Sequence, residues 1–150
     1  SDLVKQDDGS LRGWPVMDQA ERASQSAMAV KQDVKLLNEH IVDYTVYHAM
    51  SALRAKRDVR PDDFDWFLPH YSSQYFRDQV YDRMKQAGME VPYERWFTNL
   101  PTKGNTGSAS IFIILAELFH SGRLEPGQRI LCYIPESGRF STGFLSLVVE

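Results

Sequence analysis

The sequence GNTGSASIFIILAELFH, residues 104–120, joins a glycine-flanked polar turn to a helix that is apolar on almost every side. Gly122 follows as the natural end of this helix. A helix that is apolar all round must be covered all round. A small sheet covers only one side of it, so we expect a missing domain or a partner subunit on the other side. Burial by the long helices of the N-terminal part is the alternative.

The segments on either side of this helix alternate between strand-like and helix-like patterns. The expected strands are residues 64–68, 94–99, 128–134 and 140–149, and the expected helices are residues 30–55, after a break before Val30, and residues 71–87, closed by Gly88. This alternation predicts an α/β fold with a mostly parallel sheet covered on both faces. The short loop between the last two strands predicts that they are antiparallel neighbours.

The length and composition of the chain limit the classes of protein to which it can belong. The 150 residues predict a single domain, in which residues 1–15 form a loop or a short hairpin. A net charge of −3 argues against a generally basic nucleic-acid-binding protein. No apolar run approaches the roughly 20 residues that a membrane-spanning helix needs. One cysteine excludes an intrachain disulfide framework, and a reducing cytoplasmic location is expected.

Three polar clusters follow expected strands or precede the apolar helix, where ligands collect in open α/β sheets. They are His70, Asn105 and the segment 136–139, Glu-Ser-Gly-Arg. Each has a structural explanation when it is taken singly: a hydrogen-bonded histidine, a helix cap and a turn glycine. Cys132 lies among apolar residues in the middle of a strand and is expected to be an inert core residue. No metal-ligand spacing and no phosphate-binding loop occur in the sequence.

Three motifs together resemble a known family. The segment DWFLPH, residues 65–70, is similar to the one that carries the catalytic histidine of β-ketoacyl-acyl-carrier-protein synthase III. GNTGSAS, residues 104–110, resembles the asparagine motif of that family, and GRLEPGQ, residues 122–128, resembles its turn into the penultimate strand. The resemblance covers about residues 30–150. It implies the C-terminal half of a thiolase-like fold, with a mixed sheet of about five strands and helices on both faces.

The resemblance also implies a reaction, the decarboxylative Claisen condensation of an acyl thioester with a malonyl-type thioester. His70 and Asn105 would form an oxyanion hole for the enolate, and the Gly138 N–H would bind the acyl-thioester oxygen. The nucleophilic cysteine of the family lies in the N-terminal half, which is therefore an expected partner. Coenzyme A or acyl-carrier-protein thioesters are the expected substrates, without a cofactor or metal, and the full-length enzyme is expected to be a homodimer. The alternative is a non-catalytic partner subunit of a heteromeric condensing enzyme.

The sequence departs from the family pattern around the expected substrate pocket. Tyr71 begins a Tyr-Ser-Ser segment where the family has Gln-Ala-Asn, Glu136 replaces a phenylalanine and Arg139 replaces a glycine. We expect these three residues to shape the pocket. Glu136 either pairs with Arg139 to shape the loop or acts as a second acid/base, and both roles need its carboxylate on the side of His70 and Asn105.

A basic patch for an acidic carrier protein is expected on the helix after His70. Arg77, Arg83 and Lys85 are its candidate residues. A solvated helix face is the alternative, because Asp78 and Asp82 are interleaved with them.

Overall fold

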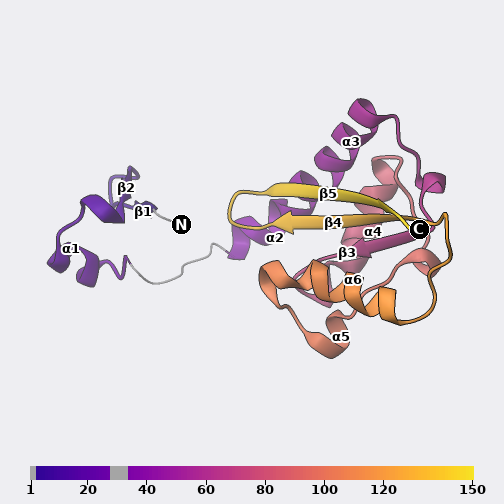
Figure 1. The fold of residues 1–150 in the computed structure, drawn as a ribbon. Helices are drawn as coiled ribbons and strands as arrows, with labels where there is room; N and C mark the ends of the chain where they lie inside the picture. Colours follow the sequence, from indigo (N-terminus) through magenta and orange to yellow (C-terminus); the bar gives the residue numbers. More distant parts are fainter. Residues whose placement is uncertain (1–2, 28–33) are drawn as a thin grey trace. The chain divides into compact units, whose positions relative to one another are not determined.

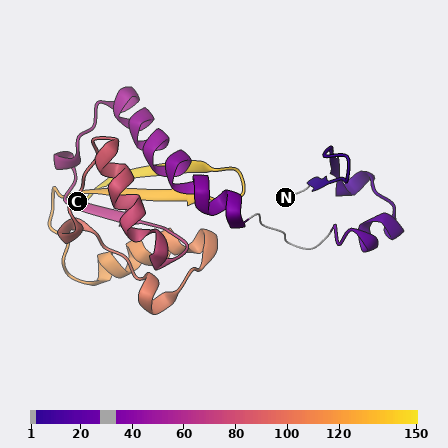
Figure 2. The same cartoon turned by 180° about the vertical axis from the view of Figure 1, so that it is seen from behind.

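The protein's structure, a computed structural model, describes residues 3–27 and 34–150 (Figures 1 and 2). These residues belong to two compact units, Ser1–Lys35 and Leu36–Glu150. The first unit contains β1 (Leu3–Lys5), β2 (Leu11–Gly13), the 3₁₀ turn η1 (Trp14–Val16) and α1 (Gln19–Ser24). β1 and β2 pair antiparallel, so the described part of the expected loop or short hairpin is a hairpin over residues 3–13. α1 begins with a capping box, in which the side chains of Asp18 and Glu21 each accept the other's backbone N–H.

A long helical segment follows, and from Leu36 onward it belongs to the second unit. It consists of α2 (Val34–Val42), the π-helical segment η2 (Asp43–His48) and α3 (Ala49–Arg57). The prediction of a main helix is confirmed from Val34 onward, whereas residues 30–33 and the expected break lie outside the described residues. The remaining helical elements are the 3₁₀ turns η3 (Pro61–Asp63), η4 (Gln74–Phe76), η5 (Tyr93–Arg95) and η6 (Gly107–Ala109), and the α-helices α4 (Arg77–Gln86), α5 (Leu100–Lys103) and α6 (Ser110–His120).

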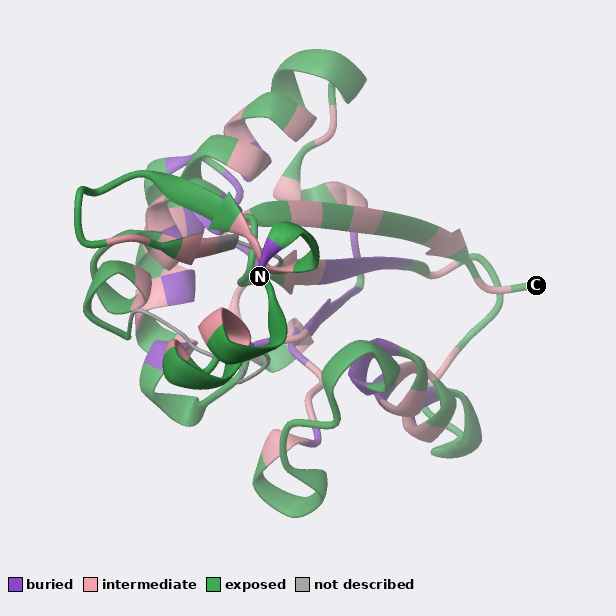
Figure 3. Cartoon of the chain, turned by 90° about the vertical axis from the view of Figure 1, so that its left-hand side faces the viewer, coloured by how far each residue is buried: buried purple, intermediate pink, exposed green. Residues whose placement is uncertain are grey.

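The sheet of the second unit is mixed and has the order β3-β4-β5. β3 (Trp66–Pro69) runs parallel to β4 (Arg129–Glu136), and β4 pairs antiparallel with β5 (Ser141–Val148). The fold class is confirmed as α/β with a mixed sheet and helices on both faces, and the five described strands are divided between the two units. β3 is buried along its whole length and β4 over residues 130–133, whereas β5 consists of exposed and half-buried residues (Figure 3).

Alternate residues of the central strands face two separate hydrophobic clusters. Phe67 and Tyr133 join a cluster formed with η2, α3 and α4, whereas Trp66, Leu68 and Cys132 join a cluster formed with α6. Successive side chains of a strand point to opposite faces of the sheet. The sheet is therefore covered by α2–α4 on one face and by α6 on the other.

Helix α6 buries only one of its apolar sides. Ile111, Ile114 and Leu118 pack against the sheet, while Phe112 and Phe119 are 69% and 65% exposed. The alternative that the long N-terminal helix covers the outer side is wrong for the described residues of α2 and α3, because they pack on the opposite face of the sheet. The expectation that a further domain or subunit covers this outer side stays a prediction.

The expected strand 94–99 is not a regular strand. The 3₁₀ turn η5 follows Pro92, and Trp96 then forms a single parallel bridge to Phe67 before α5 begins, with Pro101 in its first turn. Two prolines thus leave only a few residues between the turn and the helix, and proline cannot donate to a strand ladder.

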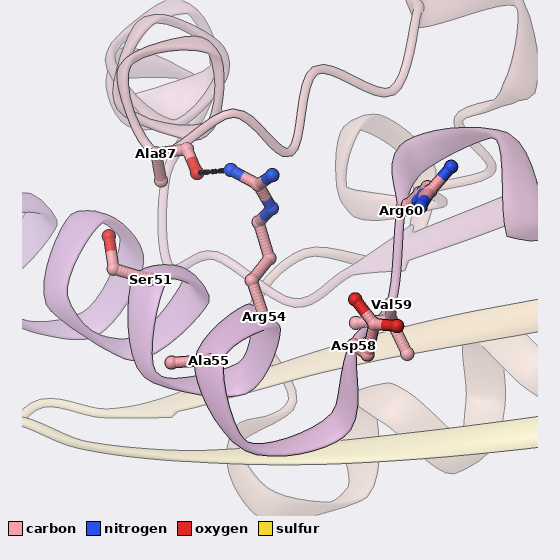
Figure 4. Close-up of a pocket in the computed structure, with 7 residues that line it drawn as sticks. All are labelled: Ser51, Arg54, Ala55, Asp58, Val59, Arg60 and Ala87. Carbon is pink, nitrogen blue, oxygen red and sulfur yellow. Dashed lines mark hydrogen bonds between the residues drawn. The ribbon is translucent and has the colours of Figure 1, made fainter.

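The end of helix α4 depends on a close approach of Arg54 to Gly88. Gly88 has φ of +68°, and the Arg54 guanidinium donates to the Ala87 carbonyl oxygen at 3.0 Å (Figure 4). A Cβ built on Gly88 would lie 2.2 Å from Arg54 Nη1, so a side chain there displaces this guanidinium.

We expect Gly88→Ala to lower the free energy of unfolding by about 2 kcal/mol, from the strain of a positive φ and the lost hydrogen bond. Gly122→Ala is the matched control, because Gly122 has φ of +70° and open space around its Cβ position; about 1 kcal/mol is expected there. Urea unfolding of both variants measures the difference. When both glycine substitutions are made in an Arg54→Ala variant, their losses of unfolding free energy should be equal. Equal losses with Arg54 present would contradict the close contact between Arg54 and Gly88.

Candidate active site

The topology brings two of the three candidate polar segments to one edge of the sheet. His70 directly follows β3, and its backbone N–H donates to the Tyr133 carbonyl oxygen of β4 at 2.9 Å. The crossover from β3 to β4 passes through α6, whose start lies on the same side as the arrowhead of β4 (Figure 1). Asn105 precedes α6, and Glu136 is the last residue of β4. His70 and the turn 136–139 thus follow the carboxyl-terminal ends of the parallel strands β3 and β4. That Asn105 meets them at this edge stays a prediction.

His70 is half-buried at this edge. Tyr71, the next residue, belongs to the cluster on the α4 face, so the alternation of side chains puts His70 on the face of α6. Burial lowers the pKa of His70 below its usual value of 6.5. The neutral ring carries one N–H donor. Among the described residues no hydrogen bond occupies this ring.

Asn105 lies in the exposed turn between α5 and η6. Its Oδ1 accepts the backbone N–H of Gly107 at 2.9 Å, which fixes the side chain at the start of the helical segment. The bond spans two residues and forms an Asx turn, whereas the N-cap of η6 is Thr106 and no side chain caps it, so the helix-cap explanation for Asn105 is wrong. The bond leaves the two amide hydrogens of Nδ2 without a partner in the described part of the chain, so they remain available as donors.

The turn after β4 is closed by the side chain of Glu136. Its Oε1 accepts the Gly138 N–H at 2.7 Å and its Oε2 accepts the Arg139 N–H at 2.9 Å. Within residues 3–27 and 34–150 the carboxylate forms no ion pair with the Arg139 guanidinium, so the expected salt bridge is replaced by two bonds to backbone. The family resemblance assigns the Gly138 N–H to binding of the acyl-thioester oxygen. In the structure this same N–H donates its hydrogen bond to Glu136.

Tyr71 is a buried residue of the core cluster on the α4 face and is 4% exposed. Its hydroxyl group is buried without a hydrogen-bond partner among the described atoms. Burial is the main reason that its pKa is raised. Its side chain thus lies on the opposite face of the sheet from the one that carries α6.

The three candidate docking cations of α4 all have acidic neighbours. Arg77 lies 3.6 Å from Asp78 and over the ring of Tyr93, Arg83 pairs with Asp43, and Lys85 lies 3.5 Å from Glu90. Exposed pairs of this kind reduce the local positive potential, although each contributes little to stability. The arrangement agrees with the solvated-face alternative.

Cys132 is fully buried in β4, as predicted, and burial raises its pKa to about 11. The thiolate form needed for nucleophilic attack is therefore disfavoured. In the described ranges there is no group of three or more His, Cys, Asp or Glu residues that could hold a metal ion. No helix in those ranges is both long and apolar enough to cross a membrane.

Two features of the structure were not found from the sequence. One is a cavity of about 540 Å³ at the end of α3. Its lining residues are Ser51, Arg54, Ala55, Asp58, Val59, Arg60 and Ala87 (Figure 4). The other is the bond from Glu136 to the turn amides. The bond from Glu136 could have been predicted, because a glutamate stands two residues before a glycine in a turn. Nothing in the sequence indicates the cavity at the end of α3.

A comparison with known families covers β3, α6 and β4. A family model described as 3-Oxoacyl-[acyl-carrier-protein (ACP)] synthase III C terminal matches residues 54–138, which is more than half of the chain. The beta-ketoacyl-[acyl-carrier-protein] synthase III of Acaryochloris marina is 36% identical over 73 residues, 49% of this chain and 20% of the relative. The synthase III of Pyropia yezoensis is 24% identical over 124 residues, 81% of this chain and 37% of the relative.

A solved structure shares the fold. The crystal structure of 3-oxoacyl-(acyl carrier protein) synthase III from Pseudomonas aeruginosa superposes with a TM-score of 0.64 at 22% identity, over 79% of this chain and 35% of that one. The chain therefore spans between a fifth and two fifths of the length of these three proteins.

Proposed function

Because the chain belongs to the 3-oxoacyl-[acyl-carrier-protein] synthase III C-terminal family, we propose that it is the half of a condensing enzyme that stabilises the enolate. The reaction is the decarboxylative Claisen condensation of an acyl thioester with a malonyl-type thioester. The observation that carries the proposal is the match of the family model to residues 54–138, which include both His70 and Asn105. In support, each of the two side chains has an N–H donor that no described group uses.

In the proposed reaction the malonyl carboxylate leaves as CO₂ and its bonding electron pair becomes an enolate. The neutral ring of His70 and the Asn105 amide donate hydrogen bonds to the enolate oxygen, where negative charge develops. The enolate carbon then forms a bond to the acyl carbonyl carbon, and the thiolate that carried the acyl group leaves. This chemistry uses thioesters of coenzyme A or of a carrier protein and needs no cofactor or metal.

The acyl-carrying thiol has to come from another part of the enzyme. Cys132 is the one cysteine of these 150 residues, and its burial and raised pKa disfavour it as a nucleophile. We propose that a cysteine-bearing N-terminal half supplies the thiol and covers the outer side of α6, and that two complete enzymes form a homodimer. The acidic partners of Arg77, Arg83 and Lys85 favour a solvated face on α4, so docking of a carrier protein on this helix is not part of the proposal.

We expect this chain by itself to self-associate through the exposed side of α6, because a large uncovered apolar patch favours association. Phe112→Ser together with Phe119→Ser should shift its sedimentation coefficient toward that of a monomer. Tyr75→Ser is the matched control, because Tyr75 is 64% exposed on a different element, and it should leave the association unchanged. A wild-type chain that stays monomeric at high concentration would contradict the role of α6.

The function is tested by assaying the enzyme that contains both halves with an acyl thioester and a malonyl thioester. The expected result is CO₂ release coupled to a ketoacyl product, whereas this chain by itself gives neither. An acyl adduct on Cys132, detected by mass spectrometry, would overturn the proposal that the thiol comes from elsewhere.

A non-catalytic partner subunit is the second candidate. The capping of the Gly138 N–H by Glu136 favours it, because that amide is then not free to bind an acyl oxygen. Condensation by the two-half enzyme and its loss in His70→Ala separate the two candidates.

A further inference from the structure

The turn after β4 holds a carboxylate between two successive backbone amides. The two bonds from Gly138 and Arg139 to Glu136 are 2.7 and 2.9 Å long. Successive N–H groups that converge in this way form a small anion-binding concavity. A Cβ built on Gly138 would lie 2.8 Å from Glu136 Oε1, so the carboxylate sits against the backbone as closely as glycine permits.

The strand side of the same turn is anchored to η2. Phe140 has φ of +49° and its ring lies 5.9 Å from that of Tyr44, and Thr142 Oγ1 donates to the Thr45 carbonyl oxygen at 2.8 Å. These two contacts hold the backbone of the turn on its β5 side. The hydrogen bond between the Gly138 N–H and Glu136 is therefore broken more readily by movement of the Glu136 side chain than by movement of the backbone.

We propose that Glu136 is an internal ligand of the Gly138 amide, which an incoming acyl-thioester oxygen has to displace. The proposal rests on the proposed function, in which this amide binds the acyl oxygen. A carboxylate accepts a stronger hydrogen bond than a neutral thioester carbonyl does. Glu136 therefore slows the acylation step and acts as a positioning residue that controls access to the Gly138 N–H.

The chain offers a second position for the displaced carboxylate. The Arg139 guanidinium, three residues along the chain, forms no ion pair in the residues that the structure describes, so it is available to pair with a carboxylate released from the amides. Glu136 then has two partners, the amides and this cation. A substrate that binds the Gly138 N–H shifts the carboxylate from the first partner to the second.

The first test detects the cap, meaning the two hydrogen bonds from the Gly138 and Arg139 amides to Glu136, and needs no activity assay. In a two-dimensional ¹⁵N–¹H NMR spectrum of this chain, Glu136→Ala should move the amide proton signals of Gly138 and Arg139 upfield and speed their exchange with solvent about tenfold. Glu136→Gln keeps one acceptor oxygen and should give an intermediate result. Glu125→Gln, an exposed glutamate before β4, is the control and should change neither signal. Unchanged signals in Glu136→Ala would overturn the proposal.

The second test measures acylation in the two-half enzyme by rapid quench with an acyl-coenzyme A. In this step the thiolate forms a bond to the acyl carbon and the coenzyme A thiolate leaves. Glu136→Ala should raise the acylation rate constant several-fold, to about tenfold, and Arg139→Ala should lower it, because the displaced carboxylate loses its second partner. A lower rate in Glu136→Ala would overturn the proposal. Absence of acylation in every variant would refute the proposed function, and the NMR result would still decide whether the cap exists.

Discussion

His70→Ala and Asn105→Ala are each expected to lower kcat for condensation by about 100- to 1,000-fold in the two-half enzyme. Each substitution removes a donor that stabilises charge only as the enolate forms, so KM for the malonyl thioester should change little. The acylation step does not use these donors and should proceed at its normal rate. Steady-state kinetics together with rapid-quench acylation measure the two steps separately.

Matched controls come from exposed residues of the same types on α2. His40→Ala and Asn38→Ala should leave kcat within about twofold, because both side chains are exposed. Equal losses in acylation and condensation would indicate a damaged fold instead of a lost donor. Full condensation activity in His70→Ala would contradict its assignment to the oxyanion hole.

The pH dependence of condensation follows from the same histidine. Burial lowers the pKa of His70, so the ring stays neutral in the folded protein at pH values where a free histidine takes up a proton. The condensation rate should therefore fall to half of its maximum at a pH below 6.5, because the ring is protonated only there. The unfolded chain binds the proton first, so the stability that this residue contributes decreases as pH falls below 6.5.

Phe67→Ala should lower the free energy of unfolding by about 3 to 5 kcal/mol. Phe67 is fully buried in β3, with ring centroids of Trp96 and Tyr133 at 5.0 and 6.2 Å. Removing this ring leaves a cavity between the sheet and helices α3 and α4, and relaxation of the structure fills it only in part. Urea denaturation followed by circular dichroism measures the loss.

Tyr75→Ala is the control for this stability measurement, because its ring is 64% exposed; its effect should lie within about 0.5 kcal/mol. A loss below 1 kcal/mol in Phe67→Ala would mean that the packing of β3 against the helices is wrong. Phe67→Ala should also disturb the candidate active site, because His70 directly follows β3 and its backbone N–H donates to β4.

Local patterns in the sequence were sufficient to predict most elements and the principal candidate residues. The apolar runs at 64–68, 128–134 and 140–149 correspond to β3, β4 and β5. The alternation of strand and helix predicted the parallel crossover between β3 and β4 through α6. The meeting of His70 and Asn105 at one edge stays a prediction from this crossover. These features follow from the order of residue types along the chain, which sets the period of burial and the direction of each element.

Only the tertiary structure decided which groups bond to each other at that edge and beyond it. Trp96 forms a bridge and not a strand, because two prolines shorten the segment that β3 could pair with. The partner of Glu136 is the turn backbone and not Arg139, because two convergent N–H groups lie closer to its carboxylate than sequence spacing can indicate. Arg54 reaches the end of α4 from a helix 33 residues earlier. Such contacts depend on distances between atoms in packed elements, and the order of residue types does not contain those distances.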